Sequence, residues 1–79
     1  MNRETRALRA WVIGDAELRQ EALGVAAAAA DLDDAARRVQ EWFEGEVWWR
    51  KACSEGGRVM ILDIGSMWRV DWRQVAAAL

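Results

Sequence analysis

Apolar residues recur every three or four positions along most of this chain, which is the spacing of one face of an α-helix. The strongest pattern lies in residues 31–51. With about 100° of turn per residue, several of its side chains point within about 60° of one direction: Leu32, Ala35, Ala36, Val39, Trp42 and Phe43. Asp31 precedes them as a candidate N-cap, and Asp34 completes a box-like pair three residues later. This segment is therefore predicted to be an amphipathic helix that organises the core.

The second half of this helix depends on Gly45. A glycine inside a helix costs about 1 kcal/mol relative to alanine, and it can also act as a C-cap that resets the phase. Good helix formers flank it, so we expect the helix to continue with at most a bend. On a continuous helix, Val47 and Trp49 lie at opposite edges of the apolar stripe and Trp48 points toward water. Two interpretations of the tryptophan pair stay open: both side chains belong to the core, or Trp48 contacts a partner.

The N-terminal part of the chain predicts two further helices. Residues 3–13 place apolar side chains on one face, with Asn2 as the cap and Gly14 just past the end. Asp15 can then cap a second helix that runs from residue 16 to about residue 30. Its run of five alanines offers a smooth face that another helix can approach closely.

The C-terminal part is less regular. Residues 54–57 combine serine with two glycines and predict a loop. Val59 to Leu62 and Ile64 could form a short buried strand, but no other stretch alternates with period two to pair with it, so we predict a buried helix over residues 58–68. Asp71 is expected to cap a last helix, residues 72–78, with Gln74 in the reciprocal position of a capping box.

Composition agrees with an all-helical chain. There is no proline, alanine is abundant, and the 79 residues include six tryptophans. A chain of this length forms one domain. We therefore predict a single all-α domain over residues 1–79, a compact bundle of four to five short helices.

Charge is unevenly distributed. The formal net charge is −2, but residues 1–12 carry +2, residues 13–46 carry −6 and residues 47–79 carry +2. The acidic middle can steer a basic partner toward the protein, although such a run is also typical of a solvated helix face. Overall acidity argues against direct nucleic-acid binding, which calls for a basic face.

The side chains that most enzymes depend on are scarce. There is no histidine, no phosphate-binding loop, and Cys53 is the one cysteine. Asp31, Asp33 and Asp34 resemble the start of a calcium loop, but the glycine and glutamate that such a loop needs further along are missing. We expect no enzymatic activity, no catalytic residue, no metal and no cofactor.

The lone cysteine also predicts a location. It cannot form an internal disulfide, which indicates a reducing, cytoplasmic environment. The N-terminal residues lack the apolar core of a signal peptide, and the alanine run is too short and too weakly apolar for a membrane span, so no membrane association is expected.

Both ends of the chain resemble a type of small helical protein carried by bacteriophages and plasmids. The matching residues are Leu8-Arg9-Ala10-Trp11-Val12 with Asp15 and Leu18, and the closing Val70-Asp71-Trp72-Arg73-Gln74-Val75-Ala76. Some mobile-element proteins of this size and acidity are anti-CRISPR proteins. These are non-enzymatic, and they bind subunits of the crRNA-guided complex or its nuclease to block target DNA binding or nuclease recruitment. The matching residues are cap and core positions, so the resemblance assigns no functional residue.

The main hypothesis is therefore a stoichiometric inhibitor, most plausibly an anti-CRISPR protein acting in the host cytoplasm. Its acids would approach the basic nucleic-acid channel of a CRISPR effector, and a tryptophan with neighbouring cations would supply the anchor. The candidate partner-binding residues are Asp33, Asp34, Glu41, Glu44, Trp48, Arg50 and Lys51.

Two alternatives stay open. A small DNA-binding or transcription-accessory regulator could contact DNA through one of two arginine groups: Arg3, Arg6 and Arg9, or Arg69 and Arg73. A homo-oligomeric structural protein, a homodimer for example, could bury its surplus tryptophans between copies.

Overall fold

The protein is entirely helical, as the computed structural model of all 79 residues shows. Helical residues make up 81% of the chain and there is no strand. The α-helices are α1 (Arg3–Gly14), α2 (Ala16–Ala27), α3 (Leu32–Trp42), α4 (Trp48–Ala52), α5 (Glu55–Ile64) and α6 (Trp72–Ala77). A π-helical turn, η1 (Phe43–Val47), joins α3 to α4 without a break, and a 3₁₀ turn, η2 (Met67–Arg69), lies between α5 and α6. Because α3, η1 and α4 form one rod, the chain has five helical units, and the predicted all-α bundle is confirmed.

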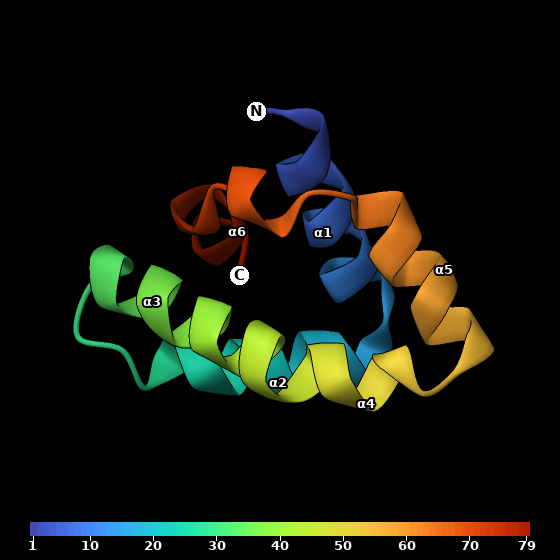
Figure 1. Cartoon of the computed structure of the whole chain (residues 1–79). Coiled ribbons are helices and arrows are strands. Elements are labelled where there is room, and N and C mark those ends of the chain that lie inside the picture. Colours follow the sequence, from blue (N-terminus) through green and yellow to red (C-terminus); the bar gives the residue numbers. More distant parts are fainter.

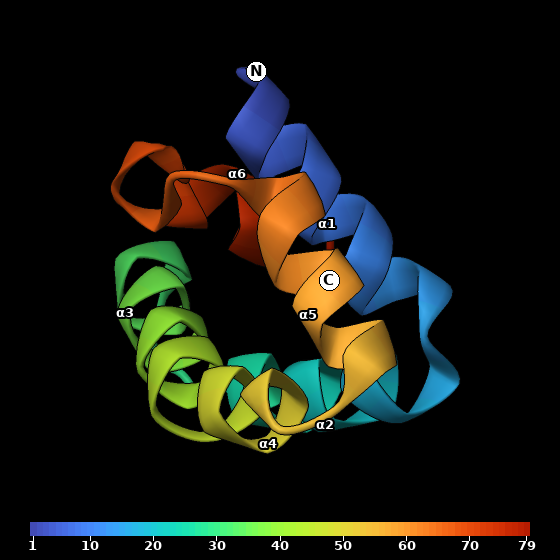
Figure 2. The same cartoon turned by 45° about the vertical axis from the view of Figure 1, so that its right-hand side comes forward.

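The rod from α3 to α4 is the base on which the other helices pack (Figures 1 and 2). Helix α2 lies along the α3 part of the rod, α6 packs on α3, and α5 packs on α4. Helix α1 contacts α2, α5 and α6 and so closes the bundle. Phe43 is fully buried in the core, with its ring centroid 6.1 Å from Trp42 and 5.9 Å from Trp72.

The predicted N-caps are confirmed. The side chains of Asn2, Asp15, Asp31 and Asp71 each accept a hydrogen bond from a backbone N–H in the first turn of the following helix. These contacts span two or three residues, so the local sequence is enough to predict them.

The predicted reciprocal bond from Gln74 to Asp71 is absent. The Asp71 N–H instead donates to the hydroxyl of Thr5 at 2.8 Å. Thr5 is fully buried in α1, so this bond ties the start of the last helix to the first helix. A partner 66 residues away has replaced the local one.

Three predicted boundaries were wrong. Helix α2 ends at Ala27, not near residue 30, because the chain must turn there and the Ala30 N–H donates to the Asp34 carboxylate. Residues 54–57 are not a loop: Ser54 is the N-cap of α5, and its hydroxyl accepts from the Gly57 N–H. The predicted helix over 58–68 ends at Ile64, because Gly65 has a φ of 80°.

The π turn explains why the predicted direction of Trp48 was also wrong. The Trp48 N–H donates to the Phe43 carbonyl, five residues back, so the turn holds one residue more than an α-helical turn. That residue rotates all later side chains back by about 100°. Val47 moves from the edge of the apolar stripe into the core, Trp48 moves from the outside to the edge, and Trp49 moves outside. Their exposures agree: Val47 is buried, Trp48 is half-buried against the core, and Trp49 is exposed.

Candidate interaction surface

Two tryptophans project from the surface of the folded chain. Trp49, at the start of α4, is 69% exposed, and Trp68, in η2, is 81% exposed. The Trp68 ring has the Arg69 guanidinium 5.1 Å from its centroid. A tryptophan is a large apolar side chain, and on this small protein two of them remain mostly in water.

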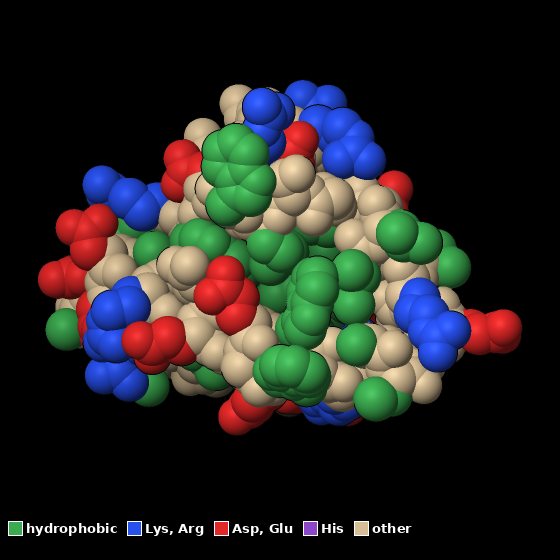
Figure 3. Space-filling view, viewed as in Figure 1, with side chains coloured by type: hydrophobic (Ala, Val, Ile, Leu, Met, Phe, Trp, Pro, Cys, Tyr) green, Lys and Arg blue, Asp and Glu red, His purple; other side chains and the backbone are tan.

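A shallow groove lies between the rod and the segment that follows α5. It encloses about 430 Å³ and is lined by Glu44, Trp48, Trp49, Gly65 and Met67, which we call the tryptophan groove. Figure 3 shows hydrophobic side chains gathered in a band across the centre of this face, between the η2 segment above and the rod below. Trp48 and Trp49 follow the π turn and Met67 follows the turn at Gly65, so the groove is lined by residues from both sides of α5 in the sequence.

Glu44 is the one charged side chain that lines the tryptophan groove. It is exposed, and its carboxylate accepts a single hydrogen bond, from the neutral Gln40 amide at 3.3 Å. No arginine or lysine pairs with it. The groove therefore combines aromatic and apolar walls with one negative charge that the chain itself leaves uncompensated.

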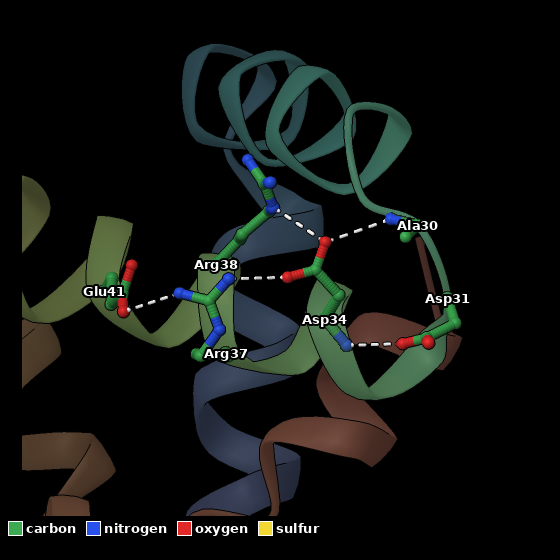
Figure 4. A network of polar contacts seen from close by, with 6 residues as sticks. All are labelled: Ala30, Asp31, Asp34, Arg37, Arg38 and Glu41. Atoms are coloured by element: carbon green, nitrogen blue, oxygen red, sulfur yellow. Dashed lines mark hydrogen bonds and ion pairs between the residues drawn. The ribbon is translucent and has the colours of Figure 1, made fainter.

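Asp34 has the opposite surroundings (Figure 4). Its carboxylate accepts from the Ala30 N–H at 3.0 Å, from Arg38 at 2.9 Å and from Arg37 at 2.6 Å. Arg37 also pairs with Glu41 at 3.0 Å. The backbone bond from Ala30, followed by the two arginines, lowers the pKa of Asp34 to about 2. Asp34 and Glu41, two predicted partner-binding acids, thus form part of a network that holds the start of α3.

Arg50 is engaged in a contact between α4 and α2. Its guanidinium pairs with Glu21 at 3.0 Å and with Glu17 at 3.4 Å. Glu21 also accepts from the Trp42 indole N–H at 3.3 Å. The hydrogen bond between Arg50 and Glu21 lowers the pKa of Glu21 and raises the pKa of Arg50. Arg50 therefore joins two helices in the free protein.

The remaining candidates lie apart from the groove. Asp33 pairs with Arg73 at 3.2 Å, which links α3 to α6. Lys51 borders a smaller hollow on another part of the molecule, beside Trp11 and Met60. Of the seven predicted residues, the structure brings only Glu44 and Trp48 into the tryptophan groove.

Sequence reasoning missed Trp49 and Met67 in the groove. On the predicted helix over residues 58–68, Trp68 was expected on the core side, and this was wrong because Trp68 is exposed. The tryptophans were visible in the sequence, but their direction depends on the π turn and on the end of α5. Both features follow from how the chain is packed.

Most of the arginines proposed to contact DNA have partners within the chain. Arg3 donates to the carbonyls of Asp63 at 2.8 Å and Ile64 at 3.2 Å, and thereby caps the end of α5. Arg73 pairs with Asp33, and Arg69 lies over Trp68. These contacts give three of the five arginines a structural role.

No cluster of three or more His, Cys, Asp or Glu side chains is placed to hold a metal ion, and Cys53 is exposed and unpaired. None of the helices is both long enough and apolar enough to cross a membrane. In comparisons with known proteins, no family model, curated protein or solved structure matches this chain.

Proposed function

We propose that this protein is a non-enzymatic binding protein that acts by covering part of a partner protein, and that its specific role is inhibition of a CRISPR–Cas effector. The observation that carries the proposal is the exposure of Trp49, which lines the tryptophan groove, and of Trp68, which follows the groove residue Met67 in the chain. Tryptophan is the residue most enriched at the energetic centres of protein interfaces.

The energetics favour a partner for these side chains. Covering a tryptophan removes on the order of 200 Å² from water, worth roughly 5 kcal/mol at about 25 cal/mol per Å². Folding gains this free energy from Trp42 and Trp72, which are buried, but not from Trp49 and Trp68. A partner protein that covers the exposed parts of these two indoles would gain free energy of this kind on binding, reduced by the entropy lost on association.

The CRISPR role rests on the resemblance of both chain ends to small phage and plasmid proteins. Here the matching residues serve the scaffold: Leu8, Val12, Leu18, Val70, Trp72 and Val75 are buried, and Asp15 and Asp71 are caps. Effector complexes hold their guide–target duplex in a positively charged channel. The uncompensated charge of Glu44 beside the groove suits such a basic surface.

Binding to purified effectors tests the proposal. The protein is mixed with effector complexes and with their separate nucleases, and complexes are detected by size-exclusion chromatography; interference is then measured in cells that express the protein. We expect a stoichiometric complex and reduced interference. The double variant Trp49→Ala, Trp68→Ala should lose both effects.

The matched control is Val59→Ala, Leu62→Ala, which removes exposed apolar side chains from α5 instead. It should bind and inhibit like the natural protein. If no effector subunit binds and interference stays complete, the CRISPR role is wrong. If the control loses binding as strongly as the tryptophan variant, the groove is not the contact surface.

A further inference from the structure

The side chains that line the tryptophan groove are the ones that recognise an organic cation. Trp48 and Trp49 offer aromatic rings, Met67 offers a polarisable thioether, and Glu44 supplies a negative charge. The face of an indole attracts a cation through its quadrupole, and tryptophan does so best among the aromatic residues. A carboxylate beside the rings completes the site by pairing with the charge that the rings attract.

The one charged side chain in the groove indicates the sign of the partner. Asp33, Asp34 and Glu41 are paired with arginines of the same chain, whereas Glu44 accepts only a 3.3 Å hydrogen bond from Gln40. A partner cation can therefore reach Glu44 without displacing an ion pair. No lysine or arginine lines the groove to repel it.

The chemistry of the two cationic side chains favours arginine over lysine. A guanidinium is planar, is weakly hydrated and can bond a carboxylate with two parallel N–H groups while it stacks on a ring. An ammonium group has no flat face to stack.

We infer, on the basis of the proposed protein-binding role of the groove, that its occupant is a segment of the partner with an arginine between apolar residues. The guanidinium lies against the Trp48 and Trp49 rings and pairs with Glu44. The apolar neighbours of that arginine contact Met67 and the exposed edge of Trp49.

Selection of peptides tests this without knowledge of the natural partner. Random peptides displayed on phage are selected on the immobilised protein and counter-selected on Trp49→Ala. We expect the enriched peptides to share an arginine flanked by apolar residues. A synthetic peptide of that sequence should bind and change the tryptophan fluorescence, and its version with citrulline in place of arginine should bind about tenfold more weakly.

Variants of the protein test whether Glu44 is the group that pairs with the arginine of the peptide. Glu44→Gln should weaken the arginine peptide on the order of fivefold and leave the citrulline peptide unchanged. Glu46→Gln is the matched control, because Glu46 lies in the same π turn but not in the groove, and it should bind both peptides like the natural protein.

The outcomes separate this inference from the proposed function. Enriched peptides that need Trp49 for binding but carry no basic residue would overturn the inference that the occupant carries an arginine. The groove would then remain a protein-binding surface. Failure to enrich any peptide, or equal binding to Trp49→Ala, would overturn the inference, whereas the proposed function is overturned only if the effectors fail to bind. A dimer that is seen by light scattering and is lost in Trp49→Ala would show that a second copy of the chain occupies the groove. A gel shift of single-stranded DNA that is lost in Trp49→Ala would show that nucleic acid occupies it. Either result overturns the inference.

Discussion

The side chains at the two ends of the α3–η1–α4 rod have opposite surroundings. At the α3 end, Asp34 is held by a backbone N–H and two arginines, and Asp33 pairs with α6. At the α4 end, Trp49 is exposed and Glu44 has no charged partner. The first end pairs its acids within the chain. At the second end Arg50 pairs with α2, but Trp49 and Glu44 leave apolar area and one charge without a partner in the chain.

The two regions should differ most in how much the free energy of unfolding falls when an aromatic side chain is removed. Phe43 is fully buried between Trp42 and Trp72, so Phe43→Ala should lower the free energy of unfolding by about 3–5 kcal/mol. Trp49→Ala should change it by less than about 0.5 kcal/mol, because its side chain is mostly in water. Denaturant unfolding followed by circular dichroism measures both. A large loss of stability in Trp49→Ala would show that the groove is part of the core.

The corner between α4 and α5 depends on a close approach at Gly57. A Cβ atom added there would overlap the backbone carbonyl group of Lys51, and the backbone would have to move. Gly57→Ala should therefore destabilise the protein by about 1–3 kcal/mol. Gly56→Ala is the control, since an added Cβ meets nothing within 4 Å; it should be neutral or stabilise by up to about 1 kcal/mol. Equal thermal midpoints for the two variants would refute the close packing of this corner.

The π turn makes a prediction about deletions. Because η1 holds one residue more than an α-helical turn, removal of Gly45 should leave a regular helix with Val47 still in the core and Trp49 still exposed. We expect a change in the free energy of unfolding of less than about 1 kcal/mol. Removal of Gly24 from the regular helix α2 should instead rotate the residues that follow by about 100° and destabilise the protein more. Thermal unfolding of both deletions checks this, and an unfolded Gly45 deletion would contradict it.

These contrasts also explain what the sequence could predict. The caps at Asn2, Asp15, Asp31 and Asp71 involve residues two or three apart, and all of them were predicted. The hydrogen bond from the Asp71 N–H to Thr5 spans 66 residues and was not predicted.

The groove was not predicted for a similar reason. The direction of the Trp48 and Trp49 side chains depends on whether the turn at Gly45 has an α or a π pattern, and a glycine between two glutamates permits both. The π turn places Val47 in the core, and packing of this kind depends on distant parts of the chain. Local hydrogen bonds were therefore predictable, whereas the phase of the helix beyond Gly45 was not.

The polar network at the α3 end should be visible as a pH dependence. The pKa of Asp34 in the folded protein, about 2, lies below the ordinary value of 3.8 for an aspartate, so the folded state favours the ionised carboxylate. The resulting stability is fully present above pH 4 and is lost as the pH falls from about 4 to about 2. Asp34→Asn removes this contribution, so its thermal midpoint should fall less than that of the natural protein over this range. Glu46→Gln is the control, because Glu46 makes no ion pair or side-chain hydrogen bond, and it should follow the natural protein. Identical acid profiles for Asp34→Asn and the natural protein would mean that the network at this end adds no stability, and the contrast between the two ends of the rod would then rest on the tryptophans alone.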